Sequence, residues 1–196
     1  MSEKNRSNNG GPLRRLWRNP LVRYGLSAVF GVTGLLLVVG SVNSTLEATN
    51  TVEFCISCHD MRTNFEEYKK TVHYSNRVGV RAGCSDCHVP KKNWFAEIRR
   101  KIVAANDVWA ELVGTIDTRE KFEAKRLEMA RHEWVRMKES DSSGCRNCHS
   151  YESMDMESQD RLSKKKHVQA VESGKTCIDC HKGIAHEMPK VQADNE

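Results

Sequence analysis

The longest apolar stretch of the chain lies near its N-terminus. Residues 24–42, YGLSAVFGVTGLLLVVGSV, are nineteen positions without a charged side chain. As a helix this stretch would be about 28 Å long, close to the roughly 30 Å hydrocarbon core of a lipid bilayer. We therefore expect one transmembrane helix over 21–42. A cleaved signal peptide would share this pattern, but the run is longer than a usual signal sequence and no clear small-x-small cleavage site follows it.

Helical periodicity returns in the middle of the chain, at 91–113. Apolar side chains recur there at spacings of three and four, as on one face of a helix. They are Trp94, Phe95, Ile98, Ile102, Ala105, Trp109 and Leu112. Gly114 follows as a helix stop. We expect this face to pack against the core or against a cofactor.

A second helix is predicted over about 118–138, because Asp117 and Glu120 have the spacing of a capping box at its start. A looser apolar stripe follows, made of Phe122, Leu127, Ala130, Trp134 and Met137.

Residues 151–173 also have a helical but polar pattern, and three lysines would form a solvated face there: Lys164, Lys165 and Lys166. The expected fold class is mainly α, with little β structure.

The net charge of +5 is concentrated at the N-terminal end. Residues 1–23 carry six basic side chains and one acidic one, so the remainder of the chain is neutral overall. This balance argues against a nucleic-acid surface on the main domain. Since basic residues flank the cytoplasmic end of membrane helices, the N-terminus is expected in the cytoplasm and the following domain outside it.

All eight cysteines belong to four copies of the pattern Cys-x-x-Cys-His. The cysteines are Cys55, Cys58, Cys84, Cys87, Cys145, Cys148, Cys177 and Cys180, and the histidines are His59, His88, His149 and His181. In this pattern two thiols bind a haem covalently and the adjoining histidine ligates its iron. Zinc sites also use Cys-x-x-Cys pairs, but they do not require a histidine after every second cysteine. The sequence therefore predicts four covalently bound haem c groups in an exported domain.

The haems would also compensate for a weak polypeptide core. The chain has 196 residues, of which 29% are charged and 7% aromatic, and small domains of this kind need staples such as metals. The first cysteines lie at 55, 84, 145 and 177, so the intervals are 29, 61 and 32. Each short interval holds one further histidine, His73 or His167. This weak repeat indicates two dihaem modules within one haem-packed domain.

A low-spin haem needs a second axial ligand, usually His or Met. Four histidines lie outside the motifs: His73, His132, His167 and His186. His132 lies among charged residues in the middle of a predicted helix, which favours a solvent-facing position. In that case one haem lacks a distal histidine, and Met61, two positions after His59, could approach the iron of the first haem. The alternative is that all four haems have two histidine ligands.

The chain resembles the NapC/NirT family of membrane-anchored tetrahaem quinol dehydrogenases. The resemblance covers nearly everything from the anchor to Pro189 and rests on long stretches in the right order: EFCISCHDM, VHYSNRVGVRAGCSDCHVP, GTIDTREKFEAKRLEMA, EWVRMKES, CRNCHSYESMDM and TCIDCHKGIAHEMP. It is strongest to members that serve periplasmic nitrate reductase. Together with the sequence pattern, it predicts a cytoplasmic basic tail over 1–20, an anchor over 21–42, a periplasmic tetrahaem domain over 43–189 and a flexible tail over 190–196.

The resemblance also implies the ligands, with haems numbered in motif order. Haem 1 would have Met61 or His59 as its axial ligand. Haem 2 would lie between His88 and His186, and haem 3 between His149 and His73. Haem 4 would have His181, with His167 as its distal ligand.

The family's quinol site lies beside haem 1, and Asp107 and Lys101 match an acid and a lysine of that site. A carboxylate is a reasonable acceptor for the protons released by quinol oxidation, and a lysine could hydrogen-bond a quinone oxygen. However, six residues on a helix correspond to about 240° of rotation, so the two side chains do not share a face. Glu97 and Lys101 also have the spacing of a simple surface ion pair.

The expected function is therefore quinol oxidation at the inner membrane, with electrons passing to periplasmic nitrate reductase in anaerobic respiration. A nitrite reductase, or several reductases served by one hub, are alternative acceptors, and the resemblance allows a homodimer. A terminal haem reductase and a structural module without haem are alternatives of a different class. Quinol dehydrogenase activity is expected, in a protein whose role is that of an electron carrier.

Overall fold

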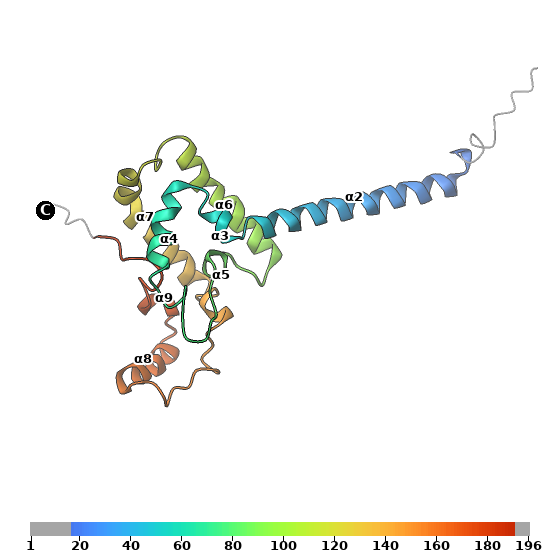
Figure 1. The fold of residues 1–196 in the computed structure, drawn as a ribbon. Coiled ribbons are helices and arrows are strands. Elements are labelled where there is room, and N and C mark those ends of the chain that lie inside the picture. The colour runs from blue at the N-terminus through green and yellow to red at the C-terminus, as the bar shows by residue number, and fades with distance from the viewer. Residues whose placement is uncertain (1–16, 191–196) are drawn as a thin grey trace, which may run out of the picture. The chain divides into compact units, whose positions relative to one another are not determined.

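The computed structural model describes residues 17–190, which are helical and contain no strand (Figure 1). The prediction of a mainly α fold is confirmed. The chain divides into two compact units, residues 1–47 and residues 48–196. Most of the predicted basic tail, 1–16, and of the predicted C-terminal tail, 191–196, lies outside the described residues.

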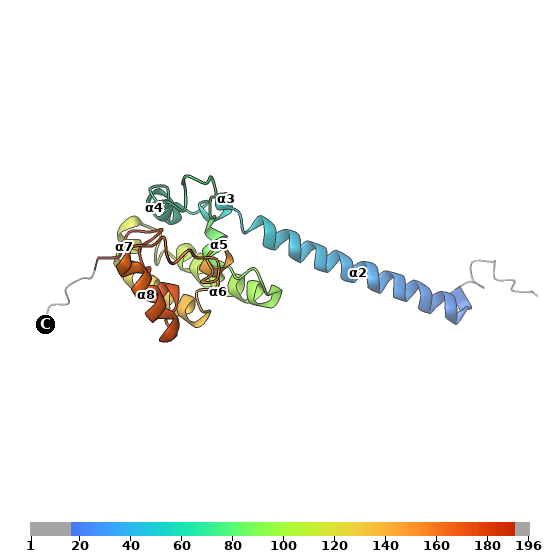
Figure 2. The same ribbon diagram turned by 90° about the horizontal axis from the view of Figure 1, so that it is seen from below.

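The main element described in the first unit is one long apolar helix, α2 (Pro20–Ala48), which both views draw as continuous (Figures 1 and 2). Its 29 residues are long and apolar enough to cross a membrane, and the predicted span over 21–42 lies within it. The apolar side chains along the span are exposed, among them Phe30, Leu36 and Val38. An exposed apolar surface of this length requires an apolar environment.

The described part of the second unit, residues 48–190, contains eight short or medium helices. They are α3 (Val52–Cys55), α4 (His59–Tyr68), α5 (Cys84–His88), α6 (Trp94–Leu112), α7 (Arg119–Glu139), η1 (Cys145–Asn147), α8 (Arg161–Glu172) and α9 (Cys177–Cys180). The four shortest, α3, α5, η1 and α9, each contain one or two cysteines of a Cys-x-x-Cys-His motif. The three longest of these helices begin at side-chain caps: Asn93 caps α6, Thr118 caps α7 and Asp160 caps α8.

The helix predicted at 91–113 is confirmed as α6, and it is followed by Gly114 with a φ of 77°. The predicted capping box of Asp117 and Glu120 is wrong, because Thr118 accepts the hydrogen bond from the Lys121 backbone N–H. The Asp117 carboxylate instead accepts a hydrogen bond from Lys121 Nζ at 2.7 Å.

The prediction of a polar helix from residue 151 is also wrong in its first part. Residues 151–160 form turns and bends, and α8 begins at Arg161. Asp160 explains this start, since its carboxylate accepts hydrogen bonds from the backbone N–H groups of Leu162 and Ser163. Of the three lysines expected on a solvated face, Lys165 and Lys166 are exposed, whereas Lys164 is half-buried and pairs with Glu157.

The polypeptide core of the second unit is small. Among its described residues, 48–190, the buried apolar side chains are Tyr68, Ile116, Phe122 and Ile178. The apolar face of α6 is not covered by the described chain: Phe95 is 75% exposed and Trp109 65% exposed. Of the two expected partners of this face, the polypeptide core does not cover these two side chains, and packing against a cofactor stays a prediction. A fold with so little buried apolar area needs other sources of stability.

The second and third motifs are held in close contact by Gly144. A Cβ atom at this position would lie 2.6 Å from the carbonyl oxygen of Cys87 and 3.0 Å from its Cα. Only glycine allows the backbone before η1 to approach α5 so closely. The contact joins the two halves of the domain where their cysteines lie.

We expect Gly144→Ala to destabilise the haem domain by about 1–3 kcal/mol, the usual cost of overpacking. Thermal unfolding followed by circular dichroism measures this effect. The neighbouring substitution Ser143→Ala adds no atom and serves as the control. Equal unfolding temperatures for the two variants would contradict the close contact between Gly144 and Cys87.

Candidate functional site

The cysteines form two similar pairs, one in each half of the domain. None of the eight forms a disulfide, and they range from half-buried to exposed. The thiols of Cys55 and Cys84 are hydrogen-bonded, and so are those of Cys145 and Cys177. The charge of Lys101 also acts on Cys55, which places this lysine close to the first motif. The first cysteines of neighbouring motifs therefore meet within each predicted dihaem module.

The second and fourth motifs have the same local structure. Asp86 accepts a hydrogen bond from the Gly83 N–H at 2.6 Å, and Asp179 accepts one from the Thr176 N–H at 2.9 Å. In both motifs this aspartate directly precedes the second cysteine and closes the first turn of the helix, as in a capping box. The cap places both thiols of each motif on one short, defined turn.

Six histidines are arranged as three facing pairs, each with one motif histidine and one histidine from elsewhere. The ring centroids are 6.3 Å apart for His73 and His149, 6.1 Å for His88 and His186, and 5.9 Å for His167 and His181. Two metal–nitrogen bonds of about 2 Å and the half-widths of the two rings add up to roughly 6 Å. Each pair is therefore spaced to hold one metal ion between two imidazoles, as haem iron requires.

Two of these pairs have polar support behind a ring. His88 Nδ1 lies 2.6 Å from Glu133 Oε1, and His167 Nδ1 lies 2.7 Å from Gln159 Oε1. Histidines that bind metals through one nitrogen usually hydrogen-bond through the other. With Nδ1 engaged, Nε2 of His88 and of His167 is the nitrogen that a metal would bind, so the residues present fit an iron-bound haem.

Two arginines lie against the Glu133 carboxylate. Arg136 donates hydrogen bonds to it, and Arg100 Nη2 lies 3.8 Å from Oε2. Burial raises the pKa of Glu133, but the hydrogen bonds from Arg136 and His88 outweigh burial and hold that pKa well below its usual value. The side chain behind His88 is therefore a carboxylate at neutral pH.

The first motif differs from the other three. His59 Nε2 lies 3.0 Å from Glu111 Oε1, and His59 Nδ1 lies 2.9 Å from Asp60 Oδ1. Both ring nitrogens thus face carboxylates, and His59 takes part in none of the three ring pairs. Asp60 is buried, and the proximity of its carboxyl group raises the pKa of Glu111. Met61 is half-buried in the same first turn of α4.

The structure does not bring Lys101 and Asp107 together. Lys101 Nζ donates a hydrogen bond of 2.7 Å to the Thr49 carbonyl, and burial lowers the pKa of this lysine. Asp107 remains accessible on another face of α6, where the surrounding protein raises its pKa by desolvation and Arg100 partly offsets the shift. Lys101 is therefore the one placed near the first motif, beside Cys55.

Three polar residues at these sites were missed by the sequence analysis. Asp60 and Glu111 face His59, and Glu133 faces His88. Asp60 could have been noticed, since it separates the two possible ligands His59 and Met61. Glu111 and Glu133 contact histidines more than forty positions away in the sequence. A local sequence pattern does not predict such a contact. His132 is exposed on α7.

Comparison with known proteins gives consistent matches. Residues 19–191 match the family model described as the N-terminal region of the NapC/NirT cytochrome c family. The denitrification system component NirT of Stutzerimonas stutzeri is 50% identical over 195 residues, which are 98% of this chain and 96% of that protein. The cytochrome c-type protein NapC of Escherichia coli K12 is 48% identical over 187 residues, or 93% of each chain.

A further relative is named for its haem content. A putative tetraheme cytochrome c of Allochromatium vinosum is 49% identical over 172 residues, which are 88% of this chain and 91% of that protein. No solved structure matches the chain. With the four motifs and the three ring pairs, these matches establish covalently bound haem c as the cofactor.

We expect four haem groups per chain, and three in a variant with both Cys177→Ser and Cys180→Ser, because this variant lacks the fourth attachment site. The absorbance of the pyridine haemochrome, divided by the protein concentration, gives the number. Ser57→Ala changes only an intervening residue of the first motif and should retain four. Fewer than four haems in the unchanged protein would contradict the assignment of all eight thiols to haem.

Proposed function

The chain belongs to the NapC/NirT cytochrome c family, and we propose that it oxidises quinol at the inner membrane and passes electrons to a periplasmic reductase. The observation that carries this proposal is the set of three imidazole pairs spaced for iron, combined with four attachment motifs in one small domain. Such an array of haems suits a chain of one-electron carriers. The apolar helix α2 supports the proposed membrane location.

The proposed ligand assignment follows the ring pairs. His88 and His186 would hold the iron of haem 2, His73 and His149 that of haem 3, and His167 and His181 that of haem 4. When bound, the haems supply the one-electron redox chemistry. The protein attaches them, orders them along the domain and sets the ligands of each iron.

For haem 1 we propose Met61 as the axial ligand. Both nitrogens of His59 face carboxylates of Glu111 and Asp60, and a ring held in this way is not directed to an iron. Met61 belongs to the same turn of α4 and carries a thioether, which is an ordinary haem ligand. With no second histidine nearby, one side of this haem is left for a small molecule.

We place the quinol beside haem 1, close to Lys101. Oxidation of a quinol to a quinone releases two electrons and two protons, so the site needs a proton acceptor and a group that holds the ring oxygens. The Lys101 ammonium lies near Cys55 of the first motif and is suited to donate a hydrogen bond to a quinone oxygen. Asp107 is the proposed proton acceptor, although it lies on another face of α6 and so serves a quinol only from that side.

The proposed orientation places the N-terminus in the cytoplasm and the haem domain in the periplasm. The charge pattern supports it, because Arg18 and Arg23 flank the N-terminal end of the apolar span. We propose periplasmic nitrate reductase as the electron acceptor, as the family resemblance implies. The relative NirT, described as a component of a denitrification system, favours a nitrite reductase as the second candidate.

The quinol site is tested by the rate at which a menaquinol analogue reduces the haems, followed by stopped-flow absorbance. We expect Asp107→Asn to slow reduction about 100-fold, as for loss of a general base. Lys101→Met should lower kcat/KM at least tenfold, since a hydrogen bond from a charged group contributes about 1.5–3 kcal/mol. Asp155→Asn and Lys165→Met are the matched surface controls. If Asp107→Asn behaves as its control does, Asp107 is not the proton acceptor.

The distal ligand of haem 4 is tested by comparing two histidines on polar helices. We expect His167→Ala to convert one haem from low spin to high spin, because it removes one of two strong axial ligands. His132→Ala, at an exposed position on α7, should leave the electron paramagnetic resonance (EPR) spectrum of the oxidised protein unchanged. A change of spin state in the His132 variant alone would reverse the roles of these two residues.

A further inference from the structure

His186 reaches its partner from a segment without regular secondary structure. The last helix, α9, ends at Cys180, and residues 181–190 form turns and irregular chain. The His186 ring nevertheless lies 6.1 Å from that of His88, the spacing of a metal-binding pair. An irregular segment loses conformational entropy when it is held in one position, so specific contacts must hold the backbone here.

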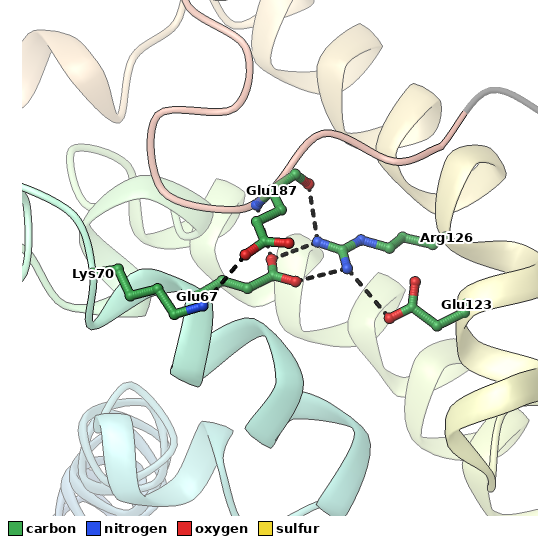
Figure 3. A network of polar contacts seen from close by, with 5 residues as sticks. All are labelled: Glu67, Lys70, Glu123, Arg126 and Glu187. Atoms are coloured by element: carbon green, nitrogen blue, oxygen red, sulfur yellow. Dashed lines mark hydrogen bonds and ion pairs between the residues drawn. The ribbon is translucent and has the colours of Figure 1, made fainter.

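Those contacts come from a buried ion pair between α4 and α7, shown in Figure 3. The Arg126 guanidinium donates two hydrogen bonds to the Glu67 carboxylate, one from each terminal nitrogen. The side chain of Arg126 is 11% exposed and that of Glu67 is 8% exposed. Arginine is suited to this paired geometry because its guanidinium is a planar fork.

The same two side chains also bind the backbone next to His186. The N–H of Glu187 donates to Glu67 Oε2 at 2.8 Å, and the carbonyl oxygen of Glu187 accepts from Arg126 Nη2 at 2.9 Å (Figure 3). Both backbone polar groups of the residue that follows His186 are thus satisfied by one ion pair. We call Glu67 and Arg126, with these two backbone bonds, the Glu187 clamp.

Two further ion pairs lie at the rim of the clamp. Lys70 Nζ is 3.4 Å from Glu187 Oε1, and Arg126 Nη1 is 3.4 Å from Glu123 Oε1. Lys70, Glu187 and Glu123 are well exposed, and exposed pairs contribute little to stability. They serve as internal controls, because they share the network but do not bind the backbone beside His186.

Helix α7 contributes to both sides of this histidine pair. Arg126 and Glu133 are seven residues apart, which is about two turns, so they lie on the same helix face. Arg126 holds the segment of His186, and Glu133 Oε1 lies 2.6 Å from Nδ1 of His88. One face of one rigid helix therefore sets the positions of the two rings relative to each other.

We propose that Glu67 and Arg126 are positioning residues for the distal ligand of haem 2. The clamp holds the backbone at Glu187 and thereby keeps His186 at bonding distance from the iron that His88 also binds. This inference rests on the proposed assignment of His88 and His186 to haem 2. Without the clamp, His186 leaves the iron for part of the time and haem 2 becomes partly high spin and open to external ligands.

The decisive variant is the double substitution Glu67→Leu with Arg126→Met. Replacing a buried ion pair by apolar residues of similar size often preserves stability, whereas removing one partner does not. The double variant can no longer bind the Glu187 backbone. We expect it to fold with four haems and to show a new high-spin EPR signal from one haem, with the other signals unchanged. Added imidazole should restore the low-spin signal by occupying the open position.

Three comparisons give each outcome one meaning. His186→Ala should show the same high-spin signal in full, and if it does not, the ligand assignment is wrong rather than the clamp. Lys70→Met and Glu123→Gln should leave the spectrum unchanged. If His186→Ala opens haem 2 and the folded double variant remains fully low spin, the clamp does not position His186 and the proposal is overturned.

Arg126→Lys covers the case in which the double variant does not fold. Lysine keeps the charge beside Glu67 but loses the planar fork, so it cannot bind the Glu67 carboxylate and the Glu187 carbonyl in the same way. We expect imidazole to bind to this folded variant at least tenfold faster than to the unchanged protein. An unchanged binding rate would overturn the proposal.

Discussion

The distance between paired imidazole rings fixes the geometry of the haem domain. Three ring pairs, from 5.9 to 6.3 Å apart, each join a motif histidine to a distant one. Since an iron bound by two imidazoles tolerates little change in this distance, each pair fixes two segments of chain relative to each other. With so few buried apolar side chains, the domain must obtain this precision from polar contacts and from the haems.

Those polar contacts are concentrated on α7 and on the motif turns. Glu133 and Arg126 act on the two sides of one ring pair, and Asp86 and Asp179 close the first turns of two motifs. A buried ion pair such as Glu67–Arg126 adds less to stability than its short distances suggest, because desolvation offsets much of the attraction. It is better suited to defining a geometry, which is the need of a loop that carries a ligand.

The attachment sites could be predicted from the sequence because their chemistry is local. Each attachment site needs two thiols and a histidine within five consecutive residues. The haem-binding cysteines, from Cys55 to Cys180, are therefore predictable without knowledge of the fold. The helix at 94–112 was predictable from its periodicity, but its exposed face was not, since periodicity does not say what covers an apolar stripe. The carboxylates behind the ligands were missed because Glu133 and His88 are 45 residues apart.

The contacts of the motif histidine distinguish haem 1 from the other three haems. His88 faces a second histidine, His186, and its Nδ1 atom contacts the carboxylate of Glu133 on the side away from the metal position. Both ring nitrogens of His59 instead contact carboxylates, those of Asp60 on α4 and Glu111 on α6. The His59 side chain therefore connects α4 to α6 and does not face another ring. Helix α4 begins at His59 and ends at Tyr68, one residue after Glu67 of the Glu187 clamp. Under the proposed ligand assignment, one rigid helix of ten residues therefore connects the open haem to the segment that holds the distal ligand of the next haem.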